Sequence, residues 1–76
     1  MEKEICTIYL GKGQLDNDYT IYENGKVYHF YDRNPFKLNI EEWLTVNQLT
    51  DETKKLLLDK CPSNVYDTLK NVLYST

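Results

Sequence analysis

His29 is the only histidine of the chain and its first candidate for catalytic chemistry. General acid–base catalysis most often uses a histidine. A nucleophilic mechanism would need His29 beside Cys6 or a serine, with a third group that orients the imidazole ring. The hairpin inferred below pairs His29 with Thr20, which is neither. We therefore predict a half-exposed strand histidine, no catalytic residue and a protein that is not an enzyme.

Metal and phosphate sites need side chains at defined spacings, and those spacings are not present. Cys6 and Cys61 are far apart and, with one histidine, offer too few ligands for zinc. The adjacent glutamates at 41–42 point to different faces of a predicted helix, and residues 16–18 lack the downstream glycine and glutamate of a calcium loop. Residues 11–13, Gly-Lys-Gly, lack the spacing of a phosphate-binding loop and are predicted to form a turn. No metal or cofactor is expected.

The tyrosines are the more informative group. The chain has seven tyrosines in 76 residues, and four of them fall within residues 19–31. Exposed tyrosines offer a large contact area at little entropic cost and are enriched in binding hot spots. Cross-strand aromatic pairing accounts for Tyr19 and Tyr28. Tyr22 and Tyr31 are predicted to stay available to a partner.

Residues 19–31 are predicted to form a β-hairpin around Asn24-Gly25. This dipeptide supplies the positive φ angles that a type I′ turn requires at both central residues. Such a turn would pair Tyr22 with Val27 across the hairpin, whereas an added bulge would exchange the two faces after Gly25. With the type I′ turn, the outer face would gather five side chains, the last of them from the first strand: Tyr22, Val27, His29, Tyr31 and Tyr9.

Further elements flank the hairpin. A strand is predicted over residues 4–10, where β-branched and aromatic residues precede a glycine. A short helix is predicted from Asn39 to a point between residues 45 and 47, because Asn39 and Glu42 fit a capping box, with Leu38 and Trp43 as a hydrophobic staple.

Two more helices are predicted in the C-terminal part. The first starts at Thr50, carries acidic residues in its first turn and ends before Pro62. The second is predicted to be capped by Ser63, after which apolar residues recur at the helical period. Residues 72–76 fit either the end of this helix or a last strand.

The order of these elements predicts an α+β fold. A sheet with one apolar face needs a cover, and the helices that follow the strands supply it. We expect a three-stranded antiparallel sheet, made of the N-terminal strand and the hairpin, with two or three C-terminal helices on one face. A chain of this length allows a single globular domain, residues 1–76.

Composition limits the partners and the compartment. The net charge is −3 and neither half of the chain is basic, which disfavours nucleic acids and anionic lipid surfaces. No signal peptide and no apolar run near ~20 residues is present, so a cytoplasmic protein with reduced cysteines is expected. The chain lacks alanine and is rich in Asn, Lys, Ile and Tyr. These residue types indicate AT-rich codons, as in a low-GC bacterium or its phage.

These observations favour a small protein-interaction module over an enzyme. The predicted contact surface is the outer hairpin face: Tyr22, Val27, His29, Tyr31 and Tyr9. An origin in a phage or mobile element would make the partner a bacterial host protein that this chain inhibits or regulates. Two alternatives use the same face, namely single-stranded nucleic-acid binding, with Lys26, Arg33 and Lys37 nearby, and a homodimer.

Overall fold

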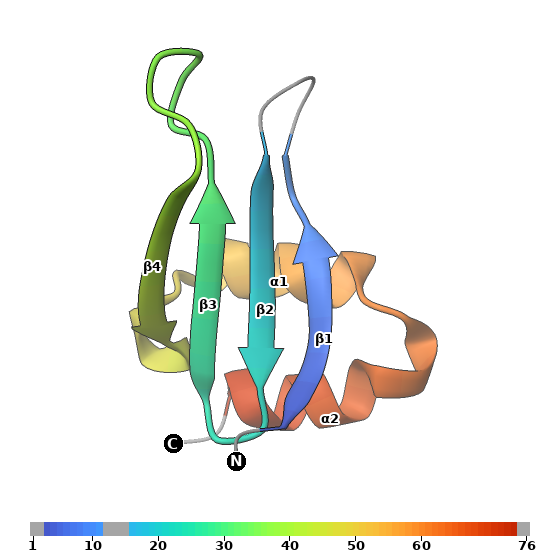
Figure 1. Cartoon of the computed structure of the whole chain (residues 1–76). Coiled ribbons are helices and arrows are strands. Elements are labelled where there is room, and N and C mark those ends of the chain that lie inside the picture. The colour runs from blue at the N-terminus through green and yellow to red at the C-terminus, as the bar shows by residue number, and fades with distance from the viewer. Residues whose placement is uncertain (1–2, 12–15, 75–76) are drawn as a thin grey trace.

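The computed structural model describes residues 3–11 and 16–74, and within them a β-meander is followed by two α-helices (Figure 1). The sheet is antiparallel, with four strands in the order β1-β2-β3-β4. The strands are β1 (Glu4–Tyr9), β2 (Asn17–Tyr22), β3 (Lys26–Tyr31) and β4 (Ile40–Thr45). The α+β class is confirmed, but the sheet has one strand more than predicted.

The β2–β3 hairpin forms where it was predicted, but with a different turn. Gly25 has φ 88°, whereas Asn24 is not among the described residues with positive φ, so the predicted type I′ turn is wrong. The Tyr22 carbonyl accepts a hydrogen bond from the Gly25 N–H at 3.0 Å, which closes a three-residue loop with a glycine bulge. Ile21 therefore pairs with Val27, one residue away from the predicted register.

This register decides which side chains face the helices. Ile21 and Val27 are fully buried and pack with residues of both helices, including Leu57 and Leu69. Because side chains alternate along a strand, Tyr22 and Tyr28 lie on the opposite face. The exchange of faces expected for a bulge at the turn is confirmed.

A strand, β4, occupies the place of the helix predicted from Asn39. Asn39 has φ 56° and donates its N–H to Oδ1 of Asp32 at 2.8 Å, which turns the chain back toward β3. From there β4 pairs with β3 over its whole length, with Trp43 opposite Tyr28 and Glu42 opposite His29. The predicted capping box and staple are wrong, because backbone pairing with β3 outweighs these local helix signals.

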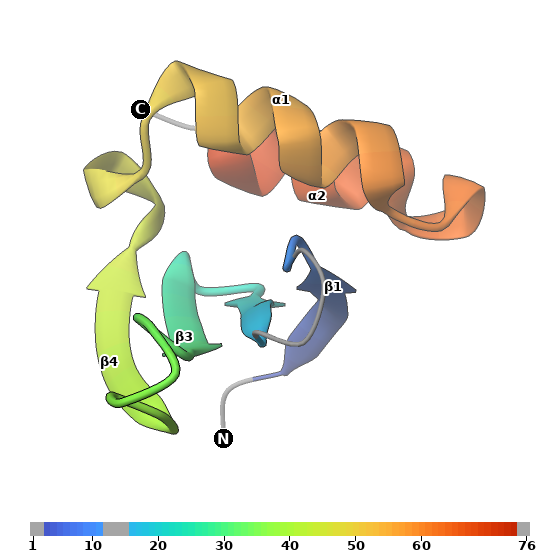
Figure 2. The same cartoon turned by 90° about the horizontal axis from the view of Figure 1, so that it is seen from above.

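The helices cover one face of the sheet. Helix α1 (Asp51–Lys60) begins as predicted, with Oγ1 of Thr50 accepting from the Thr53 N–H at 3.1 Å. A 3₁₀ turn, η1 (Val46–Gln48), leads into it from β4. A second, η2 (Ser63–Val65), precedes α2 (Tyr66–Leu73). Figure 2 shows both helices on the same side of the sheet.

Two predictions fall partly or wholly outside the described residues. The turn predicted at residues 11–13 lies almost entirely there, since only Gly11 is described. At the C-terminus, α2 continues to Leu73, so the helical alternative holds for residues 72–73, and residues 75–76 lie outside. Near the 23–25 turn the helices lie against the sheet, whereas the opposite ends of the strands extend beyond them (Figure 1).

Candidate functional site

The outer face of the sheet, meaning the face opposite the helices, carries a group of three aromatic side chains. Trp43 is 59% exposed, and its ring centroid lies 5.0 Å from that of Tyr28 and 5.7 Å from that of Tyr22. We call Tyr22, Tyr28 and Trp43 the Trp43 cluster. Such a cluster offers a large apolar contact surface with polar edges.

Three strands position the Trp43 cluster. Tyr28 and Trp43 are directly opposed on β3 and β4, so their rings meet across the ladder. Tyr22 is the last residue of β2, beside the hairpin turn. Since β4 is an edge strand, Trp43 lies at the margin of the sheet. In Figure 2 no helix lies over this face.

A carboxylate is fixed beside the aromatic rings. The Tyr28 hydroxyl donates a hydrogen bond to Oε1 of Glu41, two residues before Trp43 on the same strand. This hydrogen bond raises the pKa of the Tyr28 hydroxyl, because it stabilises the protonated phenol, and the Glu41 charge adds to the effect. The Trp43 cluster therefore adjoins an acidic group held in place by one of its own members.

Negative charge predominates on the outer face of the described strands. Asp18, Glu41 and Lys26 lie on this face by the alternation that places Tyr22 and Tyr28 outward. Glu4, which precedes a bulge in β1, pairs with Tyr22 and adds a third carboxylate. Burial raises the pKa of the Asp18 carboxyl, and the nearby charges of Asp16 and Asp32 raise it further. The face thus combines aromatic surface with a negative potential.

The five residues predicted to form the contact surface do not share a face. Tyr22 and Tyr9 lie on the outer face, whereas Val27, His29 and Tyr31 lie on the side of the helices. Val27 is fully buried, so it offers no surface to a partner. The shared-face prediction was wrong because the bulge at Gly25 shifts β3 by one residue.

Tyr28 and Trp43 were not among the residues predicted to form the contact surface. Tyr28 had been assigned to the core by the type I′ register, and Trp43 to the staple of a helix. The bulge alternative already contained the signal for Tyr28, since it turns that side chain outward. No comparable signal marked Trp43, because its place depends on the pairing of β4 with β3.

His29 forms a second polar group, on the helix side of the sheet. Its ring lies between those of Tyr19 and Tyr31, with centroids 4.2 and 4.1 Å away and nearly parallel planes. Nδ1 is 2.9 Å from Oε1 of Glu42, and Nε2 is 2.6 Å from Oδ1 of Asn17. The predicted half-exposed histidine beside Thr20 is therefore wrong.

This arrangement makes His29 a structural residue. The side chain is almost fully buried, and both ring nitrogens have polar partners on neighbouring strands, Glu42 and Asn17. Within the described residues, the two ring nitrogens are within hydrogen-bond distance of these carboxylate and amide oxygens rather than of a thiol or hydroxyl nucleophile. The contacts of His29 with Asn17 and Glu42 instead connect β2, β3 and β4 near the strand ends that extend beyond the helices.

The two cysteines are free thiols packed against the core. Burial of Cys6 raises the pKa of its thiol to about 11, and the neighbouring Cys61 adds to this. Burial also raises the pKa of Cys61. A raised pKa keeps each thiol protonated at neutral pH, and a thiol is a weaker nucleophile than a thiolate.

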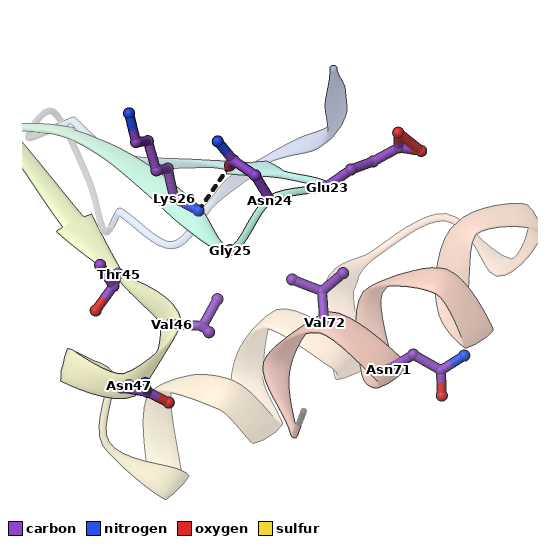
Figure 3. Close-up of a pocket in the computed structure, with 9 residues that line it drawn as sticks. All are labelled: Glu23, Asn24, Gly25, Lys26, Thr45, Val46, Asn47, Asn71 and Val72. Carbon is purple, nitrogen blue, oxygen red and sulfur yellow. Dashed lines mark hydrogen bonds between the residues drawn. The ribbon is translucent and has the colours of Figure 1, made fainter. Parts of the chain in front are cut away.

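A shallow hollow of about 620 Å³ lies between the hairpin turn and α2 (Figure 3). Val46 and Val72 form its apolar part, and Asn47 and Asn71 stand at its rim. Oδ1 of Asn24 accepts from the Lys26 N–H at 3.0 Å, so this amide already serves the turn. Glu23 and Lys26 also belong to its lining, with their charged ends pointing in different directions, and we assign the hollow no chemistry.

Comparison with known proteins adds no family. No family model, no curated protein and no solved structure matches the chain. Within residues 3–11 and 16–74, no helix is long and apolar enough to span a membrane. In the same residues, no three His, Cys, Asp or Glu side chains are grouped to hold a metal ion.

Proposed function

We propose that this chain is a small protein-interaction module that binds a protein partner through the outer face of its sheet. The Trp43 cluster forms the centre of the contact surface. The observation that carries the proposal is the exposure of Trp43, 59%, on a sheet face over which no helix lies. Trp and Tyr are the residue types most enriched in the hot spots of protein interfaces.

The packing of the cluster supports a contact role. Trp43 rests against Tyr22 and Tyr28, so its ring is held by neighbours before any partner arrives. A preorganised aromatic residue loses less conformational entropy on binding than a mobile one. The core accounts for the aliphatic residues on the other face, but it gives no reason for an exposed tryptophan on this one.

The negative charge of the outer face favours a protein partner over nucleic acid and over a second copy of the chain. Nucleic acids would meet Glu4, Asp18 and Glu41, which repel phosphate. A second copy docked by the same face would bring like charges together, which costs free energy unless they are neutralised. A protein surface of complementary charge would not experience either repulsion. The composition indicates AT-rich codons, as in a low-GC bacterium or its phage. If the gene belongs to a phage or mobile element, the partner would be a cytoplasmic protein of the bacterial host that this chain inhibits or regulates.

A displayed library of random peptides tests this proposal without knowledge of the natural partner. Peptides selected on the wild-type chain are measured against Trp43→Ala. We expect affinity to fall about thirtyfold or more, the loss associated with a hot-spot aromatic residue worth about 2 kcal/mol. Circular dichroism of the variant verifies the fold, which should survive because Trp43 is largely exposed.

Leu56→Ala is the matched control. Leu56 is also an exposed apolar residue, but it belongs to α1, on the other side of the sheet. Binding by the selected peptides should not change in this variant. If the peptides bind Trp43→Ala as tightly as wild type, or if Leu56→Ala lowers their affinity as much as Trp43→Ala does, the contact surface lies elsewhere and the proposal is refuted.

A further inference from the structure

We propose that the partner presents a basic segment to the outer face, with an arginine side chain stacked on Trp43 and paired with Glu41. This inference rests on the proposed function and specifies the chemistry of the partner. It follows from the arrangement of three residues: an exposed indole, a carboxylate on the same strand, and the tyrosine that joins them.

The spacing of Glu41 and Trp43 along β4 places the carboxylate and the indole next to each other. Glu41 and Trp43 are separated by one residue on β4, so both side chains project from the outer face. Tyr28 contacts both, through its ring with Trp43 and through its hydroxyl with Glu41. That hydrogen bond uses Oε1, and a carboxylate has a second oxygen that can accept from a partner.

A cation fits this surface better than any other polar group. The face of an indole ring carries negative electrostatic potential and attracts a cation placed over it. Arginine suits the pair particularly well, because its planar guanidinium stacks on an aromatic ring while its N–H groups donate to a carboxylate. Lysine provides the charge without the planar geometry, so we expect weaker binding.

The charges around the cluster extend the same preference. Glu4 lies opposite Tyr22 and Asp18 opposite Phe30, so carboxylates occur on both sides of the aromatic rings. Lys26 is the opposing charge on this face, beside Thr45 on β4. An acidic segment would meet repulsion from three carboxylates, whereas a basic segment would meet repulsion from one ammonium.

The single tryptophan gives a direct measurement at this site. The chain contains one Trp, so its emission, excited where tyrosine does not absorb, reports on Trp43 alone. The probes are three synthetic peptides without aromatic residues and one oligonucleotide. The first peptide alternates Arg and Ser, the second has Lys in place of Arg, and the third has Glu in place of Arg. The oligonucleotide is an oligothymidylate. We expect a saturable change with the Arg peptide, weaker binding of the Lys peptide, and no response to the Glu peptide or the oligonucleotide.

Three charge variants test the assignment of residues. Glu41→Gln removes the proposed partner of the guanidinium and should lower the affinity for the Arg peptide about fivefold, as expected for one exposed charge pair. Lys26→Gln removes the opposing charge and should strengthen binding about twofold. Glu52→Gln removes a carboxylate from α1, on the other side of the sheet, and should leave affinity within a factor of about two.

The outcomes separate this inference from the proposed function. Equal affinity for the Arg and Glu peptides, a response to the oligonucleotide alone, or equal effects of Glu41→Gln and Glu52→Gln would overturn the basic-segment proposal. If library peptides still depend on Trp43 but are neutral or acidic, the outer face remains the contact surface and only the basic partner is wrong. If neither library nor Arg peptides depend on Trp43, both proposals fail.

Discussion

His29 and Glu42 face each other across the β3–β4 ladder, with Nδ1 of the imidazole 2.9 Å from Oε1 of the carboxylate. The pair lies on the side of the sheet that also carries the core. It places a glutamate at an inward position of β4, between Ile40 and Leu44, where the strand pattern alone would call for an apolar residue. The contact therefore helps to explain both why β4 is a strand and why its sequence does not resemble one.

Replacing His29 with alanine should destabilise the fold. The change removes a stacked ring from between Tyr19 and Tyr31 and leaves Glu42 and Asn17 without their partner. Together these losses should lower the free energy of unfolding by about 2 kcal/mol. Urea denaturation measures the difference. Phe36→Ala removes a larger ring that is 94% exposed, and should change stability by less than about 0.5 kcal/mol. Similar effects of the two variants would contradict the buried position of His29.

Gly25→Ala should destabilise the hairpin through the backbone rather than through a clash. An added Cβ would meet Cγ2 of Val46 at 3.7 Å, an ordinary contact, but the φ angle of 88° is unfavourable for a residue with a side chain. We expect a loss of about 1 kcal/mol in the free energy of unfolding, and a smaller loss for Gly25→Asn. Equal stability of wild type and Gly25→Ala would mean that the turn is not the bulged one described above.

The two thiols should differ in reactivity. Cys6 is buried and the pKa of its thiol is about 11, so at neutral pH a disulfide reagent should modify half-exposed Cys61 first and Cys6 only when the chain unfolds. Cys61→Ala should leave a native protein that barely reacts, and Cys6→Ala one that reacts as fast as wild type. Rapid modification of Cys6 in the native Cys61→Ala protein would contradict its burial.

The raised pKa of the Cys6 thiol also predicts a loss of stability at high pH. In the unfolded chain the Cys6 thiol ionises near its ordinary value of 9.0, and in the folded protein near 11, so folding disfavours the thiolate. The stabilisation is complete below about pH 9 and is lost as the pH rises from 9 through 11. Thermal unfolding of wild type and Cys6→Ala should therefore differ more at pH 8 than at pH 11, with the wild type losing stability faster. Parallel pH profiles would refute this.

Much of the hairpin could be predicted from the residues, but the turn sequence alone left its register open. Asn24-Gly25 is compatible with a type I′ turn and with a three-residue loop that ends in a glycine bulge. The two differ by one residue, and that difference turns every side chain of β3 to the other face. Burial decides between them, because the observed register places Ile21 and Val27 together under the helices. Requiring these two aliphatic residues to share a face would have selected it.

The fourth strand was hidden by local signals that favour a helix. Asn39 and Glu42 have the spacing of a capping box, and Glu42 interrupts the alternation of apolar residues in β4. Its inward position depends on His29, a contact between residues far apart in the chain, which no local pattern reveals. Since Trp43 belongs to β4, the centre of the candidate site could not be found without this strand. The C-terminal helices were predicted in the right places, and the Thr50 cap is confirmed. The predicted Ser63 cap is wrong, because Ser63 begins a 3₁₀ turn and α2 starts at Tyr66 without a side-chain cap.

Nuclear magnetic resonance of the ¹⁵N-labelled chain, titrated with a library-selected peptide, tests the central claim most directly. The indole Nε1–H of Trp43 gives one resolved signal, because the chain has a single tryptophan. We predict that this signal and the backbone amides of Tyr22, Tyr28 and Glu41 shift together and saturate, while those of α1 and α2 stay unchanged. Shifts confined to the helices, with the Trp43 indole unmoved, would show that the outer face of the sheet is not the binding surface.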